Sequence, residues 1–171
     1  IDTAAPGGPD YARDNLEPRF GVDVKAVLRD ALVLDATANP DFSQVESDAP
    51  QITTNQRFEV FFPEKRPFFL ENAGFLQTAV NLLFTRRIAD PRIGAKLTGK
   101  AGAWTVGGLA ADDQAPGTRA WAGVGRTSRS PFGRSTVGAI FTRRTSGPRD
   151  NIVGGVDTRI RMGRVWTAEG Q

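Results

Sequence analysis

Acidic and basic side chains crowd one irregular stretch of the sequence, and they are its richest source of possible chemistry. The acids are Asp41, Glu46, Asp48, Glu59, Glu64 and Glu71, and the cations are Arg57, Lys65 and Arg66. Two carboxylates held about 5 Å or about 6.5–9.5 Å apart can cleave a glycosidic bond. In this hypothesis Glu46 and Glu64 form the catalytic pair. We favour the alternative that the acids are paired with arginines, because ion-pair networks perturb carboxylates without any catalytic role.

The composition excludes several other chemistries. The chain has 171 residues with no histidine and no cysteine. Zinc sites built on imidazole or thiolate, Ser-His-Asp triads, cysteine nucleophiles and disulfides are therefore impossible. Asp41, Glu46 and Asp48 lack the spacing of an EF-hand loop, and no glycine-rich loop opens a helix, so we expect neither a metal nor a cofactor. A non-enzymatic role is favoured, with a carboxylate-based hydrolase as the alternative.

Four phenylalanines in the same stretch permit a third interpretation. Phe58, Phe61, Phe68 and Phe69 are candidate stacking surfaces for an oligosaccharide. Adjacent phenylalanines more often pack into a core, and phenylalanine is a weaker platform for sugars than tryptophan. Sugar stacking is therefore the least favoured of the three interpretations.

The elements that must position these residues are mostly β-strands. Residues 20–25 and 32–39 alternate between apolar and polar positions around Arg29-Asp30, which predicts a hairpin. Residues 40–80 break the alternation and are expected to form a partly helical insertion, with a short helix from Pro67 through Glu71 that Gly74 ends. Further strands are predicted at 81–88, 93–100, 103–112, 118–127, 135–144 and 151–162. The fold class is therefore all-β, an antiparallel meander.

The last predicted strand shows the clearest two-faced pattern. Its even positions from Ile152 to Met162 are apolar or small, whereas its odd positions include Asp157, Arg159 and Arg161. A soluble sheet with one wet face and a membrane-spanning barrel both produce such alternation. Two details favour the barrel: glycine is frequent inside the strands, and the apolar faces often carry Ala or Gly instead of bulky core residues. The three tryptophans, Trp104, Trp121 and Trp166, fit an aromatic girdle or single buried or edge positions equally well.

Charge is unevenly distributed along the chain. Residues 1–80 contain 13 acidic and 7 basic residues, and residues 81–171 contain 6 acidic and 15 basic ones. The arginines are spread over the predicted strands and form no basic recognition helix, so no nucleic-acid partner is expected. An acidic insertion folded against basic strand faces explains the asymmetry, because a barrel lumen tolerates charges. The charges expected to face such a lumen are Asp23, Asp35, Asp157, Arg159 and Arg161.

Two long and unusual motifs lie between residues 35 and 71. The first reads NPDFxQVExD and comprises Asn39, Pro40, Asp41, Phe42, Gln44, Glu46 and Asp48. The second contains FFPEKRPFFLE and includes Phe58, Glu59, Pro63, Glu64, Lys65, Arg66, Pro67, Phe68 and Phe69. Together they resemble a bacterial family of unknown function whose members carry this region C-terminal to carbohydrate-binding family 9-like domains. Segments 84–88 and 94–100 match the two strands that follow in the family, and Asn72 departs from it, since Gly usually follows the glutamate.

The resemblance implies an outer-membrane β-barrel of a Gram-negative bacterium. Lipid of the outer membrane would then be a partner, and saccharides would be reached through the upstream domain. The chain opens without an initiating Met or signal peptide and closes without a terminal aromatic strand. We therefore expect residues 1–18 to be a linker and residues 19–171 to be the N-terminal part of a barrel domain within a longer chain.

Overall fold

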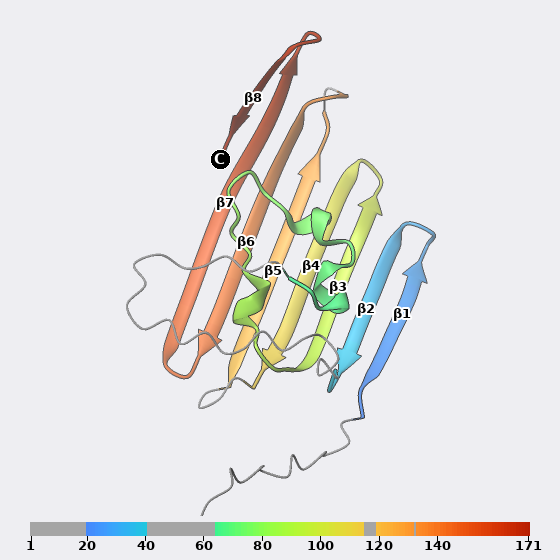
Figure 1. Cartoon of the computed structure of the whole chain (residues 1–171). Coiled ribbons are helices and arrows are strands. Elements are labelled where there is room, and N and C mark those ends of the chain that lie inside the picture. The colour runs from blue at the N-terminus through green and yellow to red at the C-terminus, as the bar shows by residue number, and fades with distance from the viewer. Residues whose placement is uncertain (1–19, 41–63, 115–118, 132) are drawn as a thin grey trace, which may run out of the picture.

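The computed structural model describes residues 20–40, 64–114, 119–131 and 133–171, and their strands form one sheet (Figure 1). The sheet is an antiparallel meander in which each strand pairs with its neighbours in sequence order. This confirms the predicted all-β meander. The strands are β1 (Val22–Leu28), β2 (Leu32–Ala38), β3 (Pro91–Ala101), β4 (Trp104–Asp113), β5 (Ala120–Arg129), β6 (Thr136–Ser146), β7 (Arg149–Met162) and β8 (Trp166–Gly170).

The first hairpin follows the predicted turn. Arg29 and Asp30 both adopt positive φ angles, 50° and 53°, and the Ala31 N–H donates to the Leu28 carbonyl at 3.2 Å. Positive φ at both central residues gives a turn whose twist matches that of the flanking strands. β8 was not predicted, because five residues are too few to show a clear alternation.

The predicted insertion leaves the sheet between β2 and β3, which pair directly with each other. The Asn39 N–H donates to the Arg92 carbonyl at 2.6 Å, so the insertion begins and ends at neighbouring points. Its described part contains α1 (Pro67–Leu70) and two 3₁₀ helices, η1 (Ala73–Leu76) and η2 (Thr85–Arg87). The predicted helical character is thus confirmed.

Two details of the insertion differ from prediction. Residues 81–88 do not form a strand, because Leu82 and Leu83 both pack against the core and consecutive residues of a strand would point to opposite faces. The insertion therefore extends to residue 90. The helix ends at Leu70, one residue before the predicted Glu71, and Gly74 does not terminate it, because Asn72 takes the left-handed conformation with φ 55° and Gly74 lies within η1.

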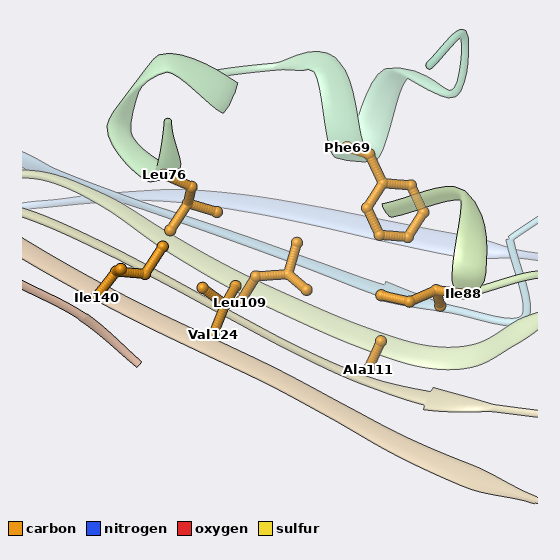
Figure 2. Packing of buried hydrophobic residues seen from close by; sticks show 7 residues of the cluster. All are labelled: Phe69, Leu76, Ile88, Leu109, Ala111, Val124 and Ile140. Atoms are coloured by element: carbon orange, nitrogen blue, oxygen red, sulfur yellow. The ribbon is translucent and has the colours of Figure 1, made fainter. Parts of the chain in front are cut away.

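The hydrophobic core lies between the insertion and one face of the sheet (Figure 2). Phe69, Leu76 and Ile88 come from the insertion and pack toward side chains of β4, β5 and β6. The sheet residues of this cluster are Leu109, Ala111, Val124 and Ile140. We call this side of the sheet the covered face.

The opposite side of the sheet, the open face, is apolar and exposed. Strand pairing places the even-numbered residues of β1, β2, β4, β7 and β8 on this face together with the odd-numbered residues of β3, β5 and β6. Its large exposed side chains include Val22, Val24, Leu28, Ile93, Leu97, Trp104, Trp121, Val137, Phe141, Ile152, Val156, Ile160, Met162 and Trp166. No helix among the described residues is long and apolar enough to cross a membrane.

Candidate functional site

The insertion lies close to the sheet above Gly107 in β4. A Cβ atom at this position would lie 2.9 Å from the Leu76 side chain and 3.0 Å from the Phe75 carbonyl oxygen. Both distances are shorter than ordinary van der Waals contact, and the carbonyl belongs to the backbone of η1. Glycine at this position therefore lets η1 lie directly on the sheet.

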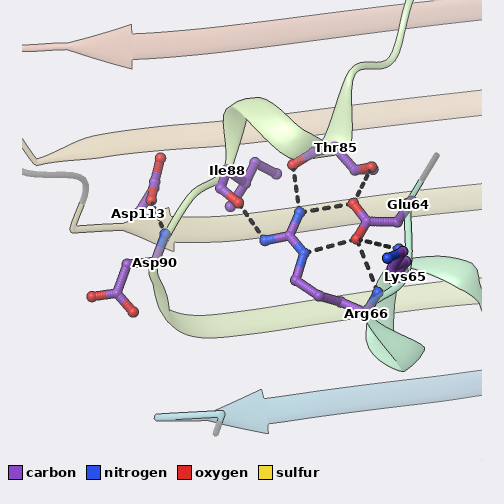
Figure 3. A network of polar contacts seen from close by, with 7 residues as sticks. All are labelled: Glu64, Lys65, Arg66, Thr85, Ile88, Asp90 and Asp113. Carbon is purple, nitrogen blue, oxygen red and sulfur yellow. Dashed lines mark hydrogen bonds and ion pairs between the residues drawn. The ribbon is translucent and has the colours of Figure 1, made fainter. Parts of the chain in front are cut away.

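Glu64 and Arg66 organise the polar contacts within the insertion (Figure 3). The Arg66 guanidinium donates to both carboxylate oxygens of Glu64 at 2.8 and 2.7 Å, and to the carbonyls of Ile88 at 2.5 Å and Thr85 at 3.0 Å. The Thr85 hydroxyl donates to the same carboxylate at 2.6 Å. The guanidinium also lies 4.2 Å from the centre of the Phe69 ring. A planar cation with five donors can make all these contacts at once, and it joins the start of α1 to η2.

This geometry gives Glu64 an unusually low pKa. Burial by itself would raise the pKa of the carboxyl, but hydrogen bonds from the side chains of Arg66 and Thr85 and from the Arg66 backbone lower it to about 2. A general acid in glycoside cleavage needs a raised pKa. Glu64 has the opposite property, and its carboxylate is fully engaged. The hydrolase hypothesis therefore has no proton donor at this position.

A second polar cluster connects the C-terminal end of α1 to β3. The Lys96 ammonium is almost fully buried and donates to the carbonyls of Phe68 at 2.6 Å and Glu71 at 2.7 Å. The Asp35 carboxylate lies 3.4 Å from it and 3.6 Å from the Lys25 ammonium, and Lys25 also pairs with the Glu71 carboxylate. The hydrogen bond from Lys25 lowers the pKa of Glu71. Lys96 thus binds the carbonyl end of a helix, where cations are favoured, and Lys25 binds the side-chain carboxylate of the residue that follows the helix.

A polar cleft of about 280 Å³ lies farther along the covered face. Its lining includes Arg126, Asp157, Arg159 and Glu169 beneath Gln77 and Thr78 of the insertion. Arg126 and Asp157 form a bidentate ion pair across β6, and a Cβ at Gly138 would lie 2.8 Å from that carboxylate. Arg159 pairs with Glu169 at 2.8 Å. The charged side chains that line the cleft are therefore paired with one another.

The five charges expected to face a lumen come from three strands of the sheet, β1, β2 and β7. Strand pairing places Asp23, Asp35, Asp157, Arg159 and Arg161 on the covered face. They do not form one site: Asp35 joins the lysine cluster, Asp157 and Arg159 line the cleft, and Asp23 and Arg161 are exposed.

The residues of the two sequence motifs that the structure describes make contacts within the fold. Asn39 donates from its side chain to the Phe20 carbonyl at 2.8 Å, and Pro40 is buried. Phe68 and Phe69 meet edge to face with ring centres 5.1 Å apart, and Phe69 belongs to the core, so it offers no platform to a sugar. Pro67 begins α1, and Lys65 is exposed. Asp41, Phe42, Gln44, Glu46, Asp48, Phe58, Glu59, Phe61 and Pro63 lie outside the described residues, as does any distance between Glu46 and Glu64.

Most acids of the insertion lie outside the described residues, so their pairing with strand arginines stays a prediction. Of the described acids, Glu64 pairs with Arg66, two residues away, and Glu71 pairs with the strand cation Lys25. Arginines of the sheet also pair with carboxylates of other strands or strand ends, as Arg144 does with Asp113 and Arg126 with Asp157.

Sequence reasoning missed Lys96, Lys25 and Thr85 as organising residues. Alternation in the predicted strand 93–100 places Lys96 on the polar face, but nothing in the sequence shows that helix carbonyls lie above it. In the part of the chain that the structure describes, no group of three acids could hold a metal ion.

The fold and site define a class of protein: an antiparallel β-meander with one exposed apolar face and one polar face covered by an inserted segment. Residues 10–101 match the family model described as "Domain of unknown function (DUF5916)". The match spans more than half of the chain, and the chain belongs to this family. No curated protein and no solved structure matches the sequence.

Proposed function

We propose that this chain forms part of the wall of an outer-membrane β-barrel in a Gram-negative bacterium, with a structural or transport role. In this proposal the open face contacts lipid and the covered face lines the lumen. The open face is the observation that carries the proposal.

The open face has the composition expected of a lipid contact. Its charged residues within strands are Asp112, Arg129, Arg143 and Asp150, and all four lie near strand ends. The interior positions are apolar apart from a few threonines, and Val156 in the middle of β7 is 70% exposed. An apolar surface of eight strands' width is far larger than the patches that soluble monomers leave in water. An outward apolar band opposite a polar interior is the pattern of barrel strands.

The covered face supports the second half of the proposal. The buried charges Lys96 and Asp35 and the partly buried Asp157 lie on this face, where an aqueous lumen would tolerate them. The insertion would then lie inside the barrel and narrow it. A link to capture or passage of saccharides rests on the family resemblance to chains with an upstream carbohydrate-binding domain, and on no residue of the structure.

A pair of substitutions in β7 tests which face meets lipid. Val156→Arg adds a charge to the open face, and Val153→Arg adds the same charge to the covered face of the same strand. We expect Val156→Arg to lower the stability of the refolded protein in lipid vesicles by about 2–4 kcal/mol, the cost of arginine near the bilayer midplane. Val153→Arg should cost much less.

The measurement is denaturant unfolding of both variants and the parent chain in vesicles, followed by tryptophan fluorescence. In a water-exposed sheet Val156→Arg would be harmless, because an exposed surface substitution changes stability little. Equal stability of the two variants, or recovery of the parent chain as a folded protein that does not associate with vesicles, would rule out the proposal.

A further inference from the structure

Charges are distributed differently at the two ends of the strands. One end carries the insertion and the connections 114–119 and 147–148, and we call it the paired end. The other carries the turns at 29–31, 102–103 and 163–165 and the connection 130–135, and we call it the basic end. In a meander, alternate connections lie at the same end of the sheet (Figure 1).

Acids and arginines neutralise one another at the paired end. Arg119 donates to both oxygens of Asp112 at 2.8 and 2.7 Å, and Arg92 lies 3.3 Å from the same carboxylate. Arg143 pairs with Asp150 at 2.9 Å, and Arg144 with Asp113 at 3.1 Å. Little unpaired charge therefore remains at the paired end to attract a charged partner.

The basic end has almost no acids. Its cations are Arg29, Lys100, Arg129, Arg134, Arg161 and Arg164, and all are exposed. Asp30 is the only acid in the four connections. Among the described residues, none of the six cations makes an ion pair. Four unneutralised cations, Arg29, Arg129, Arg134 and Arg164, therefore lie at one edge of the apolar open face, and Lys100 and Arg161 lie at the same end on the covered face.

Aromatic residues mark the boundary between the cations and the open face. Trp104 is paired with Arg129 across β4 and β5, and the guanidinium lies 5.6 Å from the centre of the indole. Trp166 follows Arg164 by two residues at the start of β8. Tryptophan is enriched where a membrane protein passes from hydrocarbon to headgroups, and arginine just beyond it is placed at the depth of the phosphates.

We infer that the basic end binds the phosphate headgroups of an anionic lipid leaflet and so fixes the direction in which the sheet crosses the membrane. This inference rests on the proposed membrane-spanning function. Lipid is favoured over nucleic acid, because the cations adjoin a broad apolar face that nucleic acid would leave exposed to water. It is favoured over free phosphate, because the cations are spread over the ends of four hairpins.

The test compares the full chain with two double variants of equal charge change. Arg134→Gln with Arg164→Gln removes two cations from the basic end, and Arg143→Gln with Arg149→Gln removes two from the paired end. Arg143 is a suitable control because its pair with Asp150 is exposed and contributes little to stability. Each protein is titrated with vesicles of phosphatidylcholine alone and with vesicles that also contain phosphatidylglycerol.

We expect the parent chain to bind the anionic vesicles more tightly than the neutral ones, with a preference that weakens as salt rises. The basic-end variant should lose about 30-fold of this preference. The paired-end variant should keep it. Insertion into both kinds of vesicle without any preference, or equal losses in the two variants, would overturn the inference and leave the proposed function intact.

Failure to insert into either kind of vesicle would overturn both proposals. Inorganic phosphate or a single-stranded oligonucleotide that removes the preference at matched ionic strength would assign the basic end to that ligand and would also overturn the inference.

Discussion

Glu64 accepts hydrogen bonds from Arg66 and Thr85 and thereby joins the start of α1 to η2. The same contacts that remove its capacity to donate a proton make it important for the packing of the insertion. A carboxylate that is stabilised in its charged form by the folded structure contributes stability that depends on pH.

The contribution of Glu64 to the free energy of unfolding should therefore depend on pH. Its pKa falls from 4.5 to about 2 on folding, so its contribution is complete above about pH 5 and is lost as the pH falls toward 2. We expect Glu64→Gln to destabilise the protein by at most about 3 kcal/mol at neutral pH, with the difference from the parent chain shrinking toward pH 2. Urea unfolding of both proteins across this pH range measures the difference. A difference in unfolding free energy between the two proteins that stays constant with pH would show that the charge of the Glu64 carboxylate does not cause the stabilisation.

At the scale of elements, close packing of η1 on β4 determines where the insertion lies. Leu76 enters the core above Leu109 and Val124, and the Phe75 carbonyl passes directly over Gly107. Gly108 follows on the other side of the strand, where the nearest atom to an added Cβ is 3.8 Å away. An added Cβ atom would therefore meet the insertion at Gly107, whereas at Gly108 it would point to the opposite face of β4.

Alanine substitutions at these two positions separate packing from backbone effects. We expect Gly107→Ala to destabilise the protein by about 1–3 kcal/mol, because the added methyl group meets backbone that cannot rotate away. Gly108→Ala should have little effect or stabilise slightly. Denaturant unfolding gives both values, and hydrogen exchange of the Phe69 and Leu70 amides in α1 reports whether the insertion loosens. Equal effects of the two substitutions would contradict the packing argument.

At the scale of the whole molecule, the three tryptophans lie at the ends of the open face. Trp104 and Trp166 begin strands at the basic end, and Trp121 lies near the start of β5 at the paired end, where Arg119 is 5.7 Å from its ring. This arrangement fits two aromatic girdles separated by an apolar band.

Depth-dependent quenching tests this arrangement. In vesicles that contain brominated lipids, bromine near the headgroups should quench the fluorescence more strongly than bromine near the chain ends, because all three tryptophans lie near interfaces. Variants in which only Trp104 or only Trp121 remains, with the others replaced by Phe, should each show the same shallow profile. Strongest quenching by the deepest bromine would contradict the proposed placement.

Much of the fold could be predicted from alternation alone. The hairpin at Arg29-Asp30, the later strands and the helical insertion after Asn39 were all visible, because side-chain period and turn chemistry are local properties. The prediction of a strand at residues 81–88 is wrong. Leu82, Leu83 and Ile88 suggest a strand because they are apolar, but in the structure these side chains contact the core beneath the insertion. β8 was too short to be detected.

The candidate site was less predictable. The motifs drew attention to Glu64, Arg66 and the two phenylalanines, but their partners Thr85, Ile88 and Lys96 lie about 20 to 30 residues away in sequence. No local pattern reveals such contacts. The partition of charges between two ends of the strands was equally hidden, since it depends on which connections the meander brings to the same end.

The sequence by itself determined a two-faced antiparallel sheet without imidazole or thiol chemistry, because alternation and composition act residue by residue. Only the tertiary structure decided which face is covered, which carboxylates form ion pairs and at which end of the strands the unpaired cations lie. Those outcomes depend on contacts between segments far apart in the chain, and the packing of the insertion on Gly107 and Lys96 is what brings those segments together.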